Sequence, residues 1–258
     1  MNPLGLLLIA GLFSVAQEKP VIPLPADPSS AIITMDRRGG FPRPRIDESP
    51  ILTIRADGRL TVIDPWGNTG SKEAVLSPSE VQDLLRFAIT EQDFFAFKAL
   101  DVRRKIEAEF AKTGIGEGIA DASDTVIRIK TANQEFEASY NALNFWSARF
   151  PDIKSLGQLR AIEIKLTSIV EELRAGGRSE IEAALILANA HIKREFPDKP
   201  AFTSDDYFRT LESVNGQRTM QFLRDQGYGA NFVLSVVYVP GKPPQITTRT
   251  EARIMPRK

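Results

Sequence analysis

The absence of cysteine most constrains what this 258-residue chain can fold into. Without cysteine the fold has no disulfides, no zinc fingers and no cysteine-ligated iron–sulfur clusters. The single histidine, His191, also excludes sites that need two imidazoles, and no motif indicates another metal or a cofactor. The folded state must therefore be stabilised by core burial, for which a hydrophobic content of 42% is sufficient.

The first sixteen residues have the pattern of a secretory signal peptide. They carry no charged side chain, run through the apolar stretch Leu4–Phe13, and end in Ser14-Val15-Ala16. Such a stretch is too short to span a bilayer as a stable helix. We therefore expect cleavage after Ala16 and a secreted or periplasmic mature chain without a transmembrane segment. The alternative is an uncleaved amphiphilic anchor at the N-terminus.

Positive and negative charges balance along this chain. Thirty-three Lys and Arg residues oppose 33 Asp and Glu residues. A chain without net charge has no global field that would hold a polyanion, so nucleic acid is not an expected partner. An exported protein without cysteine fits a bacterial envelope or exterior better than an animal secretome. The expected partner is accordingly a protein or a glycan of the envelope.

The chain divides into two predicted domains. Residues 17–30, four of which are proline, predict an extended linker. The first domain is expected over residues 31–175 and the second over residues 178–256, because Gly176 can adopt the left-handed conformation that ends a helix. Segments typical of strands and helices occur in both parts. We expect an α+β fold of two small domains, with antiparallel sheets and helices packed on one side.

In the first domain, β-branched runs separated by turn residues predict strands. A strand is expected over residues 31–35, and Asp57-Gly58 predicts a hairpin between residues 51–55 and 59–63, since glycine tolerates the positive φ of a tight turn. A second hairpin is expected around Ala132-Asn133, from residues 125–130 and 134–140.

Helical signals surround these strands. Ser77-Pro78-Ser79-Glu80 predicts a capping box with proline at the first helical position. A second helix is expected over residues 101–112 and a third over residues 156–174, each with one apolar stripe. The phenylalanines between the first two helices, Phe94, Phe95 and Phe97, are expected in the core.

The second domain is predicted to be one helix followed by strands. The helix covers residues 178–195 and is expected to begin with a capping box from Ser179 to Glu182. The strands are expected over residues 207–214, 218–223, 232–239 and 245–253. Because residues 232–239 are apolar on both faces apart from Ser235, this strand should be central in its sheet.

One helix followed by an antiparallel meander resembles a cystatin-like topology. That resemblance covers residues 178–256 and implies a fold only, because the Gln-x-Val-x-Gly and Pro-Trp hairpins of the cystatin inhibitors are absent. In the first half, the Arg38-Gly-Gly-Phe41 loop, the Ile54–Arg59 hairpin and the Ile119–Val126 segment are similar to an uncharacterised group of exported bacterial proteins. This second resemblance implies an envelope or secreted setting and no activity.

Arginine is concentrated in one predicted loop. Arg37, Arg38, Arg43 and Arg45 are interleaved with Gly39-Gly40, and such a loop can hold a phosphate or carboxylate through forked guanidinium donors. Alternatively, the loop pairs with the acidic residues beside it. A nucleotide phosphate loop is not supported, because the Gly-x-x-x-x-Gly-Lys pattern is missing.

The two tryptophans, Trp66 and Trp146, fall in predicted loops. There they would stack on a sugar ring or insert into a partner, or alternatively cap the end of a sheet.

The remaining candidates are acids and the lone histidine. Asp121, Asp124 and Glu117 lie in a Gly-rich loop that offers oxygen ligands for Ca²⁺, but without EF-hand spacing; the alternative is ordinary turn acids. Asp205-Asp206, adjacent on a predicted extended segment, point to opposite faces and are poorly placed to share a proton. His191 is either a general base or lone ligand, or a partly buried side chain at the margin of a helix–sheet interface.

These observations predict an exported, non-catalytic binding or structural module of the bacterial envelope or exterior. The predicted binding residues are Arg37, Arg38, Arg43, Arg45, Trp66 and Trp146, and no catalytic or metal-ligating residue is predicted. The alternatives are a hydrolase that works through carboxylates such as Asp121 and Asp124, and a cystatin-like inhibitor.

Overall fold

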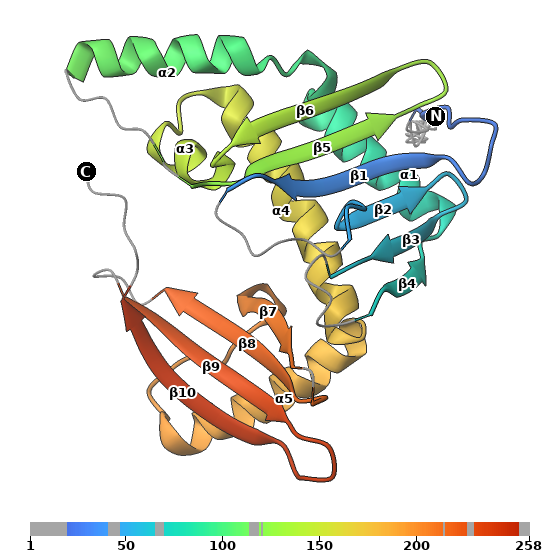
Figure 1. The fold of residues 1–258 in the computed structure, drawn as a ribbon. Helices are drawn as coiled ribbons and strands as arrows, with labels where there is room; N and C mark the ends of the chain where they lie inside the picture. Colours follow the sequence, from blue (N-terminus) through green and yellow to red (C-terminus); the bar gives the residue numbers. More distant parts are fainter. Residues whose placement is uncertain are drawn as a thin grey trace, which may run out of the picture.

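The chain folds into two antiparallel sheets with helices, which confirms the predicted α+β class (Figure 1). The computed structural model describes residues 20–40, 47–64, 70–113, 119, 121–213, 215–225 and 230–252. The predicted signal peptide lies outside these residues and stays a prediction.

The larger sheet has six strands in the order β4-β3-β2-β1-β5-β6. All neighbouring strands pair antiparallel, and Gly58 has a φ of 83°, so both predicted hairpins are confirmed. β1 is longer than predicted and includes Arg37 and Arg38, because its last residues pair with β5. The strands are β1 (Ala31–Arg38), β2 (Leu52–Arg55), β3 (Arg59–Val62), β4 (Lys72–Val75), β5 (Asp124–Lys130) and β6 (Glu135–Asn141).

Four α-helices belong to this sheet: α1 (Pro78–Arg86), α2 (Ala99–Thr113), α3 (Leu143–Arg149) and α4 (Lys154–Ala175). The predicted capping box of α1 is present, because Ser77 N–H donates to the Glu80 carboxylate at 2.7 Å and Glu80 N–H donates to Ser77 Oγ at 3.3 Å. A π-helical turn (Phe87–Glu91) extends α1, and a 3₁₀ turn (Phe94–Ala96) precedes α2. Neither turn, nor α3, is predicted from the sequence.

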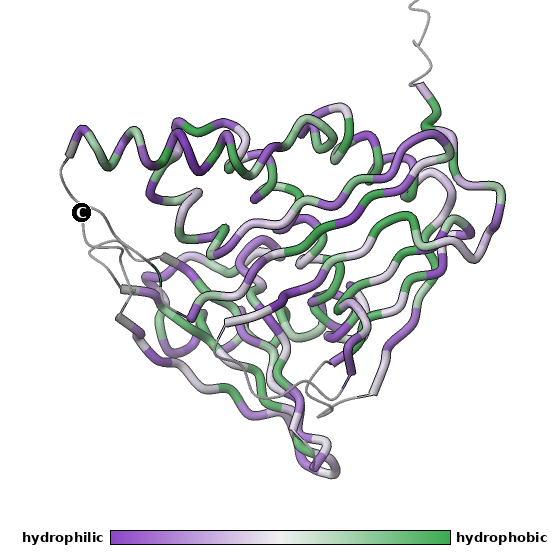
Figure 2. Tube along the Cα trace, turned by 45° about the horizontal axis from the view of Figure 1, so that its top comes forward, coloured by the Kyte–Doolittle hydropathy of each residue, from purple (hydrophilic) through white to green (hydrophobic). Residues whose placement is uncertain are grey.

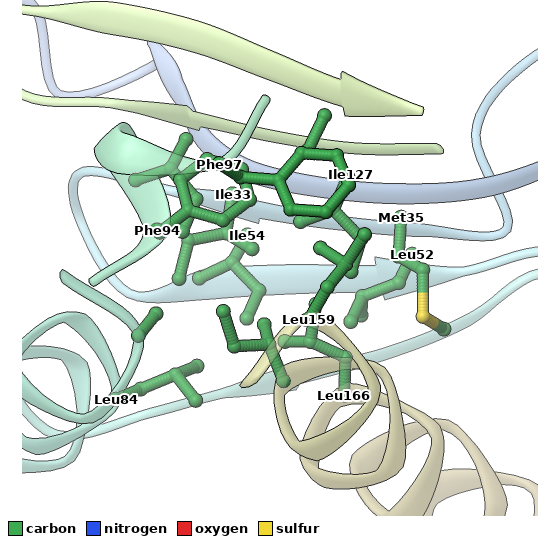
Figure 3. Packing of buried hydrophobic residues seen from close by; sticks show 14 of the residues in the cluster. Ile33, Met35, Leu52, Ile54, Leu84, Phe94, Phe97, Ile127, Leu159 and Leu166 are labelled. Carbon is green, nitrogen blue, oxygen red and sulfur yellow. The ribbon is translucent and has the colours of Figure 1, made fainter. Parts of the chain in front are cut away.

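The core of this part lies between the sheet and helices α1 and α4. Figure 3 shows Ile33, Ile54 and Ile127 of the sheet facing Leu159 and Leu166 of α4, and all five side chains are buried. Burying one such side chain contributes about 1.5–3 kcal/mol. Phe94 and Phe97 are also buried and Phe95 is half-buried, in agreement with their predicted place in the core.

The segment before β1 also lies against this core. Residues 20–25 have no regular secondary structure, yet Ile22 and Leu24 pack on the core cluster. The side-chain amide of Gln82 in α1 accepts from Ile22 N–H at 2.8 Å and donates to Ile22 O at 2.9 Å. These contacts hold the segment on the surface of α1.

The second sheet has four strands in the order β10-β9-β8-β7. Helix α5 (Arg178–Glu195) packs on it through Ile181, Ala184, Ala188 and Ile192. β9 lies inside the sheet, as its apolar sequence predicts. A 3₁₀ turn (Ser204–Asp206) leads into the strands β7 (Tyr207–Glu212), β8 (Arg218–Asp225), β9 (Ala230–Tyr238) and β10 (Gln245–Ala252).

The start of α5 differs from the prediction. Gly177, not Ser179, occupies the cap position, and no side chain caps the helix. Glu180 N–H already donates to Gly177 O at 3.2 Å, because the left-handed Gly176 and the positive φ of Gly177 turn the chain within two residues. Glu182 instead pairs with Arg178 at 3.4 Å.

Cationic side chains join the two sheets at the C-terminal end of α4. Lys72 of β4 donates to Arg174 O at 2.8 Å and pairs with Glu212 of β7 at 2.7 Å. Arg218 of β8 donates to Ala175 O at 2.8 Å. These donors satisfy terminal carbonyls of the helix, where positive charge is favourable.

Candidate binding groove beside strand β6

A groove of about 470 Å³ lies between α2, the edge strand β6 and α3. Two residues singled out from the sequence, Trp146 and Asp124, line it together. The groove combines apolar, aromatic and charged side chains, which is the usual composition of a site that both holds and orients a partner. Its lining residues are Ala99, Leu100, Arg103, Ile106, Glu107, Phe110, Asp124, Ser139, Tyr140, Asn141 and Trp146.

The aromatic wall of the groove is built around Trp146. The sequence predicts a loop here, but the structure places Trp146 in α3, which corrects that prediction. Its ring stacks on Phe150 at 6.0 Å and meets Phe110 of α2 edge-on at 5.9 Å. Packing of this kind stabilises a short helix that local propensity alone would not form.

The opposite wall comes from one face of α2, whose hydrophilic and hydrophobic residues alternate along the helix (Figure 2). Arg103 and Glu107 are exposed, are one turn apart, and make no hydrogen bond or ion pair with any residue that the structure describes. Elsewhere on the same helix, Arg104 pairs with Asp101 at 3.8 Å and Lys112 with Glu109 at 2.6 Å. The two charges that face the groove are therefore available to a partner.

Tyr140 of β6 forms part of the floor. Its ring is half-buried and meets Phe97 edge-on at 6.1 Å. Burial raises the pKa of the Tyr140 phenol above its ordinary value, the Arg103 charge opposes this rise, and the Glu107 charge adds to it. The phenol is therefore neutral near pH 7 and has a proton to donate. Within the described parts of the chain its hydroxyl makes no hydrogen bond.

The arginines predicted to bind a ligand have other partners where they are described. Arg37 pairs with Glu163 of α4 at 3.0 Å, and Arg38 pairs with Asp36 at 3.4 Å and Glu137 at 3.5 Å. These ion pairs connect β1 to α4 and to β6. Arg43, Arg45 and Trp66 lie outside the described residues, so their binding role stays a prediction.

Two of the candidate acids, Asp124 and Asp206, are engaged in local structure. Asp124 accepts from the Asn141 side-chain amide at 2.9 Å. Asp205 and Asp206 lie in a 3₁₀ turn rather than on the extended segment predicted, and Asp206 pairs with Arg224 at 2.6 Å. Across the residues that can be described, which exclude Glu117, no three His, Asp or Glu side chains are grouped to hold a metal ion.

His191 lies on α5, half-buried, beside Phe196 at 6.2 Å between ring centroids. Its Nδ1 is 3.3 Å from Arg194 Nη2. This is the position at the margin of a helix–sheet interface that one of the two interpretations of the sequence predicts.

Arg103, Glu107 and Tyr140 are among the groove residues that sequence reasoning did not single out. The sequence does contain one indication of where two of them lie. Arg103 directly follows Val102, and Glu107 directly follows Ile106, and both Val102 and Ile106 belong to the apolar stripe of this helix. They must therefore flank the buried face of α2. That pattern does not show which structural element lies opposite them.

Comparisons with protein-family models, with curated proteins and with solved structures give no match to this chain. The two resemblances noted from the sequence therefore stay predictions, and the class that the fold defines is an α+β protein with two antiparallel sheets. None of the helices in the described ranges is both long and apolar enough to cross a membrane.

Proposed function

We propose that this protein is an exported, non-catalytic binding module of the bacterial envelope or exterior, and that it holds a segment of a partner protein in the groove between α2, β6 and α3. The observation that carries the proposal is that Arg103 and Glu107 line an aromatic groove. Neither charge has a protein partner among the described residues. Elsewhere on α2, Arg104 and Lys112 pair with acids one turn away, whereas Lys105 makes no ion pair within the described ranges and does not line this groove.

The aromatic geometry favours a polypeptide over a sugar. A sugar ring stacks on an exposed aromatic face, whereas Trp146 is half-buried and packs against the rings of Phe110, Phe145 and Phe150. Leu100, 65% exposed at the mouth of the groove, offers aliphatic surface to an apolar side chain instead. The Arg103 guanidinium would then pair with a carboxylate of the bound segment, and the Tyr140 hydroxyl would donate to a carbonyl or carboxylate oxygen.

The proposal is tested by capture from envelope extract with three forms of the mature chain. Arg103→Glu reverses the charge in the groove, whereas Arg104→Glu makes the same change one residue further along, at a side chain that does not line the groove. We expect the wild type and Arg104→Glu to retain the same partner and Arg103→Glu to lose it. Equal retention by all three forms would refute the groove as the site.

A direct measurement follows from the captured species. The interacting segment, prepared as a synthetic peptide, should bind with an affinity that falls at least about tenfold in Arg103→Glu, because loss of one charge-assisted contact corresponds to about 1.5–3 kcal/mol. Thermal melting curves of the variants serve as the control for folding, since both substituted positions are exposed.

A further inference from the structure

The four edges of the two sheets differ in how they are protected against pairing with another strand. β4 has only four residues and its Lys72 pairs with Glu212, which itself lies at the end of β7. β7 also has an irregular register between Tyr207 and Arg209, and β6 has α2 beside it. Short strands, irregular register and covering helices are the usual means of preventing edge-to-edge association.

β10 is neither short nor irregular in register, although α5 lies beside it on one face of the sheet. It has eight residues and pairs with β9 in unbroken register from Gln245 opposite Val237 to Ala252 opposite Ala230. It contains neither proline nor lysine. Figure 1 shows β10 at the outer edge of its sheet, and no other described strand pairs with its free side. Thr247, Arg249 and Thr250 are exposed. An edge of this length and regularity is a template for a further strand.

The charges of β10 indicate which strand fits. Arg249 and Glu251 are two positions apart, so their side chains lie on the same face of the sheet, and they pair with each other at 2.6 Å. In an antiparallel pair of two β10 strands related by a two-fold axis through Thr250, Arg249 of each copy lies opposite Glu251 of the other. The strand is therefore complementary in charge to itself.

Other registers fit less well. Side chains alternate between the two faces along a strand, and two residues that lie directly opposite each other must point to the same face. A two-fold axis perpendicular to the sheet must therefore pass through a residue and not between two residues. An axis through Thr248 would place the two copies of Arg249 on a diagonal, where like charges repel, and would place Glu251 opposite Gln245. Only the axis through Thr250, which pairs residues 248–252 of one copy with residues 252–248 of the other, makes both charged residues face an opposite charge.

We propose that two copies of this chain associate through β10, pairing antiparallel about a two-fold axis at Thr250, so that the two four-stranded sheets form one continuous sheet. The interface is isologous and closed, which limits the assembly to a dimer. This inference stands apart from the proposed function, because β10 is not part of the groove beside β6.

The test is the oligomeric state of charge variants, measured by sedimentation over a wide range of protein concentration. The wild type should be a dimer. Arg249→Glu and Glu251→Arg should each weaken the dimer at least about tenfold, since each change turns two attractive cross-strand contacts into repulsive ones. Lys242→Glu, an equal change of charge in the exposed turn before β10, should leave the dimer intact.

Mixing the two single variants provides the decisive result. The Arg249→Glu chain is acidic at both positions and the Glu251→Arg chain is basic at both, so an equimolar mixture should form a heterodimer although each variant alone is monomeric. The double variant Arg249→Glu/Glu251→Arg should recover the wild-type dimer. A monomeric wild type, or single variants that remain dimeric, or a mixture that stays monomeric, would overturn the proposal. Because these residues are exposed, circular dichroism should show all variants folded.

Discussion

Replacing Glu163 with glutamine tests whether Arg37 serves the fold of this protein. Glu163 lies on α4 with its side chain only 1% exposed. Its carboxylate accepts hydrogen bonds from Arg37 Nη2 of β1 at 3.0 Å, from Thr125 Oγ1 of β5 at 2.9 Å, and from Arg160 one turn earlier on α4. The buried carboxylate therefore connects the longest helix of the larger sheet to two of its central strands.

Glu163→Gln keeps the size of the side chain, removes its charge and converts one acceptor oxygen into a donor. That donor would face guanidinium groups, so at least one charge-assisted hydrogen bond, worth about 1.5–3 kcal/mol, is lost. The side chains of Arg37 and Arg160 are 44% and 31% exposed, so water replaces part of the interaction. We expect a loss of about 2–3 kcal/mol, below the ~3–5 kcal/mol typical of breaking a fully buried pair.

Urea unfolding followed by circular dichroism measures this loss as a lower midpoint at an unchanged slope. Glu172→Gln, an exposed position on the same helix, is the matched control and should change stability by less than about 0.5 kcal/mol. A double-mutant cycle with Arg37→Gln should show coupling between the two residues. If Glu163→Gln costs no more than the control, or if the two losses simply add, Arg37 is not held by Glu163 and its role as a ligand-binding residue gains support.

Two further predictions concern a pH-dependent ion pair and a tight turn. Burial alone raises the pKa of Asp206, but hydrogen bonds and charge from Arg224, with hydrogen bonds from Thr203, hold that pKa below its ordinary value. The stability from this pair is therefore present above the unfolded-state pKa of about 4 and is lost as the pH falls through the folded-state pKa. Asp206→Asn should accordingly unfold at lower urea than the wild type at neutral pH, with midpoints that converge in acid; a constant gap at all pH values would contradict this. Gly58→Ala should cost about 3 kcal/mol, because φ is 83° and a Cβ would clash with the Leu76 carbonyl oxygen, whereas Gly39→Ala, at a φ of 67° with open space around it, should cost about 1 kcal/mol. Equal shifts in thermal unfolding for the two alanine variants would show that the clash is absent.

Elements whose signals are local were predictable from the sequence. The capping box at Ser77 and the Asp57-Gly58 turn act through atoms only a few residues apart, so their outcome is largely independent of the rest of the fold. The apolar stripe of α4 likewise indicates which face of the helix is buried. The same reasoning failed at Ser179, where the geometry of two successive glycines decided the first turn of α5.

The groove shows where local reasoning ends. The sequence singled out Trp146 and Asp124 but placed the tryptophan in a loop, because α3 has seven residues and is held by ring contacts with Phe110 and Phe150. A helix this short is marginal without packing, and the packing partner Phe110 comes from α2, in another part of the chain. No short stretch of the sequence shows that Phe110 packs against Trp146.

By itself, the sequence determined the class of fold, the positions of most strands and helices, and the exclusion of cysteine chemistry, since each depends on composition or on neighbours along the chain. Only the tertiary structure decided which charges are used internally. Arg37 and Arg103 look alike in the sequence, yet Arg37 meets a buried carboxylate 126 residues away while Arg103 meets no such partner among the residues described. The physical reason is that charge pairing depends on distances across the fold, whereas secondary structure depends on distances along the chain.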